Sequence, residues 1–343
     1  DRSSAASDVY KRQDFWHHNF GKISLFWASI LIIPFVIKEG IGVTLYELLH
    51  VGLLEYVPFI ILLLALFTIS GGVRLTGALV GTPIVNLAII LIGTFLASWM
   101  GTTGAAMLLI RPLINANKHR KNIVHIIVFF IFLVANIGGS LTPLGDPPLF
   151  LGFLKGVDFF WTTTAMFVPM LIMIIALSII FYFLDSYYLK KEDIKIEAPQ
   201  GKLKLGIEGV FNLGLIVGVI GAVLISGFWK PHISFEVYSG VHLELQNLTR
   251  DILLLILTYI SWTYTPQQIR KDNEYTWFPI IEVAKLFAGI FVTIIPAIAI
   301  LKAGTNGALS GIINAVSSDN GPVNIMYFWY TGCLLYTSPS PRD

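Results

Sequence analysis

The stretch that most limits how this chain can fold is residues 135–148, which read A-N-I-G-G-S-L-T-P-L-G-D-P-P. Apolar runs at 123–134 and 149–154 flank it on either side. Proline lacks an N–H donor and clashes with the preceding helical turn, so a stretch with three prolines cannot be one continuous α-helix. We therefore expect two helical arms separated by irregular backbone.

This interrupted stretch also limits where the chain can lie. Neither flanking run is long enough to cross a bilayer, but residues 123–154 together are. Irregular backbone at membrane depth is tolerated only where protein or a water-filled cavity satisfies it, and an acid there marks an ion or substrate path. We expect a broken span carrying Asp146. Two alternatives stay open: an extramembrane loop, or an Asp146 that only caps the following helix.

The composition sets the broad class of the protein. Hydrophobic residues make up 55% of the chain and charged residues 13%, about half the charge of a soluble domain. Several runs of about twenty apolar residues predict an all-α, multi-pass membrane protein rather than a β-barrel. The net charge of +2 gives no reason to expect a nucleic-acid partner. Spans are expected at 24–37, 56–71, 160–187, 207–228, 249–264 and 277–301, with 42–55 in the membrane interface.

A second interruption lies earlier in the chain. Residues 75–100 are apolar, a Gly-Thr-Thr-Gly sequence follows at 101–104, and a shorter apolar arm returns over 105–114. We interpret this as a re-entrant helical hairpin with Thr102 and Thr103 near its tip, with a kinked ordinary span as the alternative. Basic residues favour the inner side of a membrane, and the basic loops alternate correctly only if 75–114 enters and leaves on the same side.

The two halves of the chain resemble each other weakly. Residues 58–67 align with 278–287, and Thr102-Thr103-Gly104 aligns with Asp319-Asn320-Gly321 at nearly the same offset. This pattern predicts an inverted repeat with a second hairpin at 305–332, an architecture of secondary transporters. The expected division is a first repeat at 14–188, a cytoplasmic linker at 189–205 and a truncated second repeat at 206–332.

Both ends of the chain read as foreign sequence. Residues 3–13 (SSAASDVYKRQ) and 333–343 (CLLYTSPSPRD) resemble the translation of transposase sequencing adapters. We therefore expect residues 1–13 and 333–343 to be artefacts and residues 14–332 to be a fragment. The only cysteine, Cys333, lies in the second artefact, so cysteine content carries no information about the redox compartment.

The sequence at 136–148 resembles the ion transporter superfamily, which includes arsenite permeases, dicarboxylate carriers and NhaD-type sodium/proton antiporters. The segments 16–18, 101–112, 282–291 and 319–322 are most similar to the NhaD-type branch, also labelled citrate transporters. The resemblance covers residues 14–332. It implies a bacterial inner-membrane protein in which hairpin tips and broken helices of both repeats hold a cation at mid-membrane. Gly321-Pro322-Val323 departs from the expected Ala-Pro-Thr.

These matches suggest a site for sodium and protons. Sodium is a hard cation that favours oxygen ligands, and Asp146 is the carboxylate for which we expect sodium and protons to compete. Glu282 and Lys285, one helical turn apart, are expected to form either a structural ion pair or a proton relay. We expect no cofactor, no catalytic residue and no metal beyond transported sodium, with the bilayer as surroundings and a homodimer left open. The expected ion-binding residues are Thr102, Thr103, Asn136, Thr142, Asp146, Asp319 and Asn320.

The sequence also bears on functions other than antiport. Arsenite efflux is weakened by the lack of a native thiol, and citrate uptake by the scarcity of arginines expected at membrane depth. An intramembrane aspartyl protease would use a Gly-x-Gly-Asp motif and a second acid. Gly145-Asp146 with Asp185 imitates this only loosely, because Pro143 occupies the first glycine position. The sequence therefore favours a transporter over an enzyme.

Overall fold

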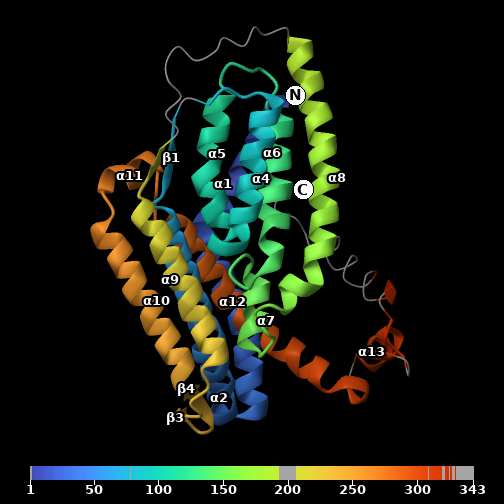
Figure 1. The fold of residues 1–343 in the computed structure, drawn as a ribbon. Coiled ribbons are helices and arrows are strands. Elements are labelled where there is room, and N and C mark those ends of the chain that lie inside the picture. Colours follow the sequence, from blue (N-terminus) through green and yellow to red (C-terminus); the bar gives the residue numbers. More distant parts are fainter. Residues whose placement is uncertain are drawn as a thin grey trace. The chain divides into compact units, whose positions relative to one another are not determined.

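The structure, a computed structural model, describes residues 2–77, 79–192, 206–307, 309–318, 321–323, 325–326 and 329 (Figure 1). The chain forms two compact units, which we describe separately. One contains residues 1–52 and 281–343, and the other contains residues 53–280. The predicted repeat boundary lies partly outside the described residues, so the two-repeat division stays a prediction.

Long helices dominate the described residues. Seven stretches are long and apolar enough to cross a membrane, which confirms the all-α, multi-pass class. Residues 42–55 do not form the separate interfacial segment that we expected, because they continue into the next helix. Their acid Glu55 is buried and paired with Lys155. The seven stretches are Gly21–Glu39, Ile41–Ser70, Pro83–Met100, Val124–Leu141, Trp161–Glu192, Val210–Phe228 and Phe278–Ile300.

The first unit is built from the two ends of the chain. Gly21 packs closely against Lys285, and Gly289 against Ser24, so the helices that carry them lie side by side. Its elements are α1 (Arg2–Glu39), α2 (Ile41–Val51), most of α12 (Phe278–Lys302), a 3-10 turn (Gly304–Asn306), α13 (Ser310–Val316), β5 (Ser317–Ser318) and β6 (Gly321–Pro322).

The second unit holds the remaining elements, and its core is rich in buried phenylalanine, including Phe59, Phe130 and Phe181. The predicted span at 249–264 forms α10, one turn longer at its start. The elements are a π turn (Gly52–Tyr56), α3 (Val57–Ser70), β1 (Arg74–Thr76), α4 (Pro83–Met100), α5 (Thr102–Ala116), α6 (Val124–Phe130), a π turn (Ile131–Asn136), a 3-10 turn (Ile137–Leu141), α7 (Pro147–Leu154), α8 (Trp161–Glu192), β2 (Gly206–Glu208), α9 (Val210–Phe228), β3 (Ser234–Tyr238), β4 (Val241–Glu244), α10 (Leu245–Tyr264) and α11 (Gln267–Asp272).

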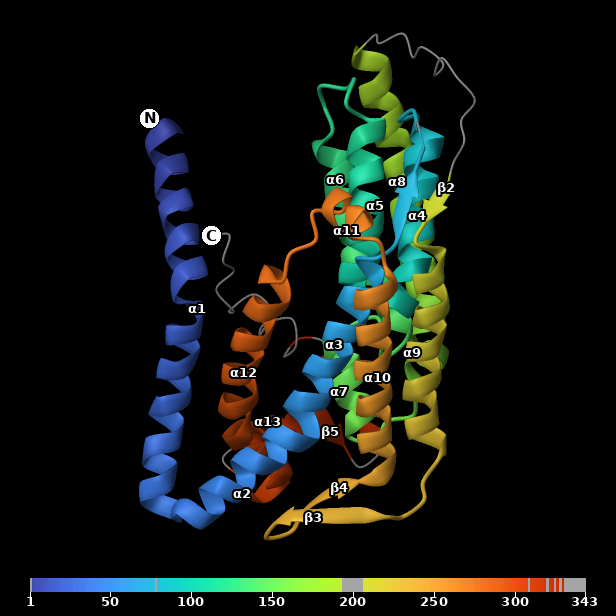
Figure 2. The same ribbon diagram turned by 90° about the vertical axis from the view of Figure 1, so that its left-hand side faces the viewer.

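Short antiparallel strands join loops at opposite ends of this unit. β1 pairs with β2 in the register Arg74↔Glu208, and β3 pairs with β4 beyond the ends of α9 and α10 (Figure 2). Arg74 also pairs with Asp272 of α11 at 2.5 Å. The loops that carry these three charged residues therefore meet at one end of this unit.

Helices α4 and α5 form the predicted hairpin. Thr82 caps α4 by accepting a hydrogen bond from the Val85 amide at 3.3 Å, and Gly101 turns the chain at φ +79°. At the open end, the Gly81 amide donates to the Ala116 carbonyl at 2.8 Å. The chain thus leaves the hairpin where it entered, so the helical hairpin is confirmed and the kinked span is wrong. Entry and exit on the same side of a membrane stays a prediction.

Candidate ion-binding site

The broken helix lies against the tip of the hairpin. α6 ends in the π turn at Ile131–Asn136, the 3-10 turn at Ile137–Leu141 follows, and irregular backbone at 142–146 precedes α7. The Thr102 amide donates to the Gly145 carbonyl at 3.2 Å. The two interrupted elements that the sequence singled out therefore meet in space, although they are about forty residues apart in the chain.

One side chain of α4, Ser98, and one side chain of the break, Thr142, hold the break against α4 near this contact. The Ser98 hydroxyl donates to the Gly138 carbonyl, and the Thr142 hydroxyl donates to the Ser98 carbonyl. Thr142 is 1% exposed, and its oxygen also accepts from the Leu144 amide at 3.2 Å. Both roles of the Thr142 hydroxyl are thus used inside the protein, so this residue fixes the turn.

The glycines of the motif make this close approach possible. A Cβ on Gly138 would lie 2.7 Å from the Thr94 carbonyl oxygen, and one on Gly139 would lie 2.7 Å from Cγ2 of Thr102. A Cβ on Gly145 would overlap the Gly139 backbone. The absent side chains therefore allow the broken segment to fold onto itself and onto the hairpin tip.

Asp146 follows this contact directly. It is the residue before α7, and Pro147 and Pro148 occupy the first positions of that helix, where proline loses no hydrogen bond. The side chain makes no capping hydrogen bond, so the alternative that Asp146 is only a helix cap is wrong. Asp146 is exposed, and within the described ranges its carboxylate has no hydrogen-bonding or ionic partner.

The two segments that meet here carry several oxygen atoms besides the Asp146 carboxylate. Within the described part, the carbonyl oxygens of the buried residues Pro143 and Leu144 accept no hydrogen bond. Thr102 is half-buried and Thr103 is exposed, both in the first turn of α5. Such an oxygen-rich set, with one carboxylate, suits a hard monovalent or divalent cation.

Asn136 lies at the other end of the break. Its amide nitrogen donates to the Ile131 carbonyl at 2.9 Å, so this group closes the π turn. The amide oxygen remains at an exposed position. Asn136 therefore helps to shape the break, and a direct ligand role for it stays a prediction.

The other predicted site residues lie outside the unit formed by residues 53–280, which contains this site. Asp319 and Asn320 lie outside the described residues. Glu282 is half-buried and Lys285 is exposed, both on α12 in the other compact unit. Their expected ion pair or relay role stays a prediction.

Some residues that support the site carried no recognisable signal in the sequence. Thr162 and Thr163, in the first turn of α8, both donate to the Leu141 carbonyl, at 3.0 and 2.6 Å. They replace the helical hydrogen bond that the break removes from Leu141. Ser98 acts similarly from α4. Serines and threonines inside apolar runs are common, so only the structure shows these roles.

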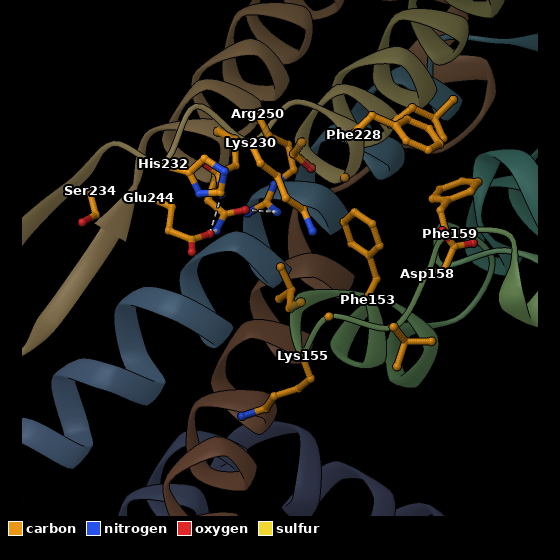
Figure 3. Close-up of a pocket in the computed structure, with 18 of the residues that line it drawn as sticks. Phe153, Lys155, Asp158, Phe159, Phe228, Lys230, His232, Ser234, Glu244 and Arg250 are labelled. Carbon is orange, nitrogen blue, oxygen red and sulfur yellow. Dashed lines mark hydrogen bonds between the residues drawn. The ribbon is translucent and has the colours of Figure 1, made fainter.

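A cavity of about 660 Å³ lies beyond the far end of α7 (Figure 3). It is bounded by the ends of α7 and α9, the connection into β3 and the start of α10, and Lys155, Lys230, His232 and Arg250 line it. Asp158 and Glu244 also line it, so the cavity carries both signs of charge. α7 has eight residues, so Asp146 and this cavity lie about 12 Å apart along the helix.

Arg250 differs from the other charged residues of the cavity wall in being almost fully buried while one of its nitrogens is left without a hydrogen bond among the described residues. It is 1% exposed, its Nε donates to Asp251 at 2.8 Å and its Nη1 to Asn247 at 3.2 Å. Its Nη2 has no partner among the described residues. Arg120 and Arg270 are also buried. Arg120 lies in the loop between α5 and α6, and Arg270 lies in the short helix α11, so their burial does not place them at membrane depth. The expected scarcity of arginines at membrane depth stays a prediction.

Comparisons with known proteins give one result. Residues 5–337 match a protein family described as "Putative citrate transport". No curated protein and no solved structure matches the chain. The family match covers nearly the whole chain and agrees with the resemblance to the ion transporter superfamily. The chain therefore belongs to this citrate-transport family.

Proposed function

We propose that this protein is a secondary active transporter that exchanges sodium for protons, with Asp146 as the carboxylate for which the two ions compete. The observation that carries the proposal is the Asp146 carboxylate, which has no hydrogen-bonding or ionic partner among the described residues and follows the point where the hairpin tip meets the broken helix. A carboxylate that holds either a metal ion or a proton couples the two movements without any covalent chemistry.

The oxygen atoms of the two segments that meet here support a cation rather than an anion as the ligand. The carbonyls of Pro143 and Leu144 and the hydroxyls of Thr102 and Thr103 are neutral oxygen donors, and Asp146 supplies one negative charge. Neutral oxygens with a single carboxylate match the charge of one sodium ion. No basic side chain pairs with Asp146 within the described ranges.

The test uses the full chain in proteoliposomes with a trapped pH dye. A sodium gradient is expected to drive proton movement in the opposite direction, and Asp146→Asn is expected to abolish it because the amide cannot take up a proton. Glu39→Gln, which neutralises an exposed acid far along the chain from the break, should leave exchange intact. Unchanged sodium-driven proton flux in Asp146→Asn would refute the proposal.

A second candidate is sodium-coupled uptake of a carboxylate such as citrate. The buried Arg250 in the wall of the 660 Å³ cavity favours it, because guanidinium binds carboxylates through paired hydrogen bonds. The same proteoliposomes distinguish the two functions. Sodium-dependent citrate uptake that falls at least about tenfold in Arg250→Gln would favour this candidate, consistent with about 1.4 kcal/mol or more from a charged hydrogen bond.

A further inference from the structure

A buried polar cluster lies at the open end of the hairpin, away from the tip. Its centre is Asp185 of α8, which is fully buried. Arg120 pairs with one carboxylate oxygen at 2.6 Å, and His125 of α6 bonds the same oxygen at 2.7 Å. Asn86 of α4 donates to the other oxygen at 3.0 Å. We call Asn86, Asn117, Arg120, His125 and Asp185 the Asp185 cluster.

Two asparagines connect this cluster to both arms of the hairpin. Asn86 lies in the first turn of α4, and Asn117 directly follows α5. Their side-chain amides bond each other twice, at 3.1 and 2.7 Å, and Asn117 also donates to the Leu113 carbonyl at 2.8 Å. Gly81 approaches the Asn117 side chain so closely that a Cβ there would overlap it. One carboxylate on α8 therefore holds the start of one arm and the end of the other.

Such a cluster is poorly explained as a source of stability alone. Burying an ion pair costs desolvation energy that its attraction often does not exceed, and apolar residues of similar size are frequently as stable. The Nε of Arg120 has no partner among the described residues, so the cluster is not fully satisfied. These contacts instead fix the relative positions of α4, the end of α5, the loop before α6, α6 and α8. The bonds to Asp185 and the bonds between the two asparagines each join two of these elements.

We propose that Asp185 is a positioning residue for the ion site: through Asn86 and Asn117 it fixes the base of the α4–α5 hairpin, and thereby the placement of the hairpin tip against Gly145 and Asp146. α4 has 18 residues and acts as a lever about 27 Å long between base and tip. A small tilt of α4 at its base therefore produces a larger displacement of the hairpin tip. The contact that responds is the Thr102–Gly145 hydrogen bond. The link to ion binding rests on the function proposed above.

The decisive variants remove the bonds to the hairpin without leaving a buried charge unpaired. Asp185→Asn would leave Arg120 buried and unpaired, so loss of folding would be uninformative. Asn86→Ala and Asn117→Ala instead remove the link to the hairpin and keep Asp185 paired with Arg120 and His125. Asn212→Ala is the matched control. Asn212 is equally buried and bonds Gly72, Thr265 and Ser261 in the same unit, with no bond to the hairpin.

Hydrogen–deuterium exchange of the purified full chain measures the effect without relying on transport. Peptides covering 101–105 and 142–146 are expected to exchange at least about tenfold faster in Asn86→Ala and Asn117→Ala, the effect of losing one to two net hydrogen bonds. In Asn212→Ala their rates should match the parent chain. Unchanged tip exchange in the two hairpin variants, or an equal rise in all three, would overturn the proposal.

A transport measurement then separates this proposal from the proposed function. If sodium exchange is observed, Asn86→Ala should raise the sodium KM about tenfold while the maximal rate changes less than about twofold, since a displaced tip weakens binding first. If faster tip exchange occurs in a chain that moves no sodium, the positioning role stands and the antiport function fails. An altered sodium KM in Asn212→Ala as well would attribute the effect to general destabilisation and count against Asp185.

Discussion

Glycine 145 decides at the residue scale whether the ion site can form. Its backbone lies against the Gly139 backbone, which cannot move as a flexible side chain can. Gly145→Ala is therefore expected to cost about 1–3 kcal/mol of unfolding free energy through overpacking and to abolish transport.

Gly152→Ala is the matched control for this variant. Gly152 lies in the adjoining α7, and a Cβ added there would lie 3.8 Å from Cγ2 of Val157, its nearest neighbour. It should change stability by less than about 1 kcal/mol, favourably, because alanine is the better helix former. Thermal unfolding in detergent compares the two, and equal melting temperatures would contradict the prediction.

The sequence showed which residue types belong together at this scale but not what each side chain does. Three prolines and an acid in one short stretch predicted the break, and the Gly-Thr-Thr-Gly sequence predicted the hairpin tip. The roles of Thr142 and Ser98 could not be predicted, because their partners lie 44 and 40 residues away in the chain. The role of Asp185 could not be predicted either, because only tertiary contacts join it to its partners at 86, 120 and 125.

At the scale of elements, the one-residue turn between α4 and α5 is the most sensitive point. Gly101 has φ +79° and ψ 150°, a region that is open essentially only to glycine. Gly101→Ala should cost about 1–3 kcal/mol and displace the hairpin tip, so that transport falls sharply. Gly40 has nearly the same backbone angles, φ 86° and ψ 163°, and open space around it. Gly40→Ala should lose comparable stability yet keep transport, which proteoliposome flux and melting temperature together would reveal. Equal loss of transport in both variants would assign the effect to strain alone.

Element boundaries followed from the sequence where composition changed abruptly. The helical hairpin and the break were predicted because glycine and proline interrupt long apolar runs. The continuity of Ile41–Ser70 was not predicted, because Glu47, His50 and Glu55 give the stretch 42–55 an interfacial composition. Glu55 is accommodated by a distant lysine, Lys155, which no local pattern reveals.

For the whole molecule, the prediction to test is which loops share one side of the membrane. The structure of residues 53–280 places both ends of the hairpin together, through the bond from Gly81 to Ala116, whereas the β3–β4 connection lies beyond the other ends of α9 and α10 (Figure 2). The basic residues around 118–121 assign the hairpin ends to the inner side.

In a Cys333→Ser background, single cysteines introduced as Gly77→Cys and His119→Cys should resist a membrane-impermeant maleimide in intact cells. Cysteine introduced as His242→Cys should react, and all three should react after the membrane is permeabilised. Opposite labelling of positions 77 and 119 would mean that residues 75–114 cross the bilayer once. In that case Thr102 would lie inside an ordinary span, and the hairpin tip that contacts Gly145 would not exist in the membrane.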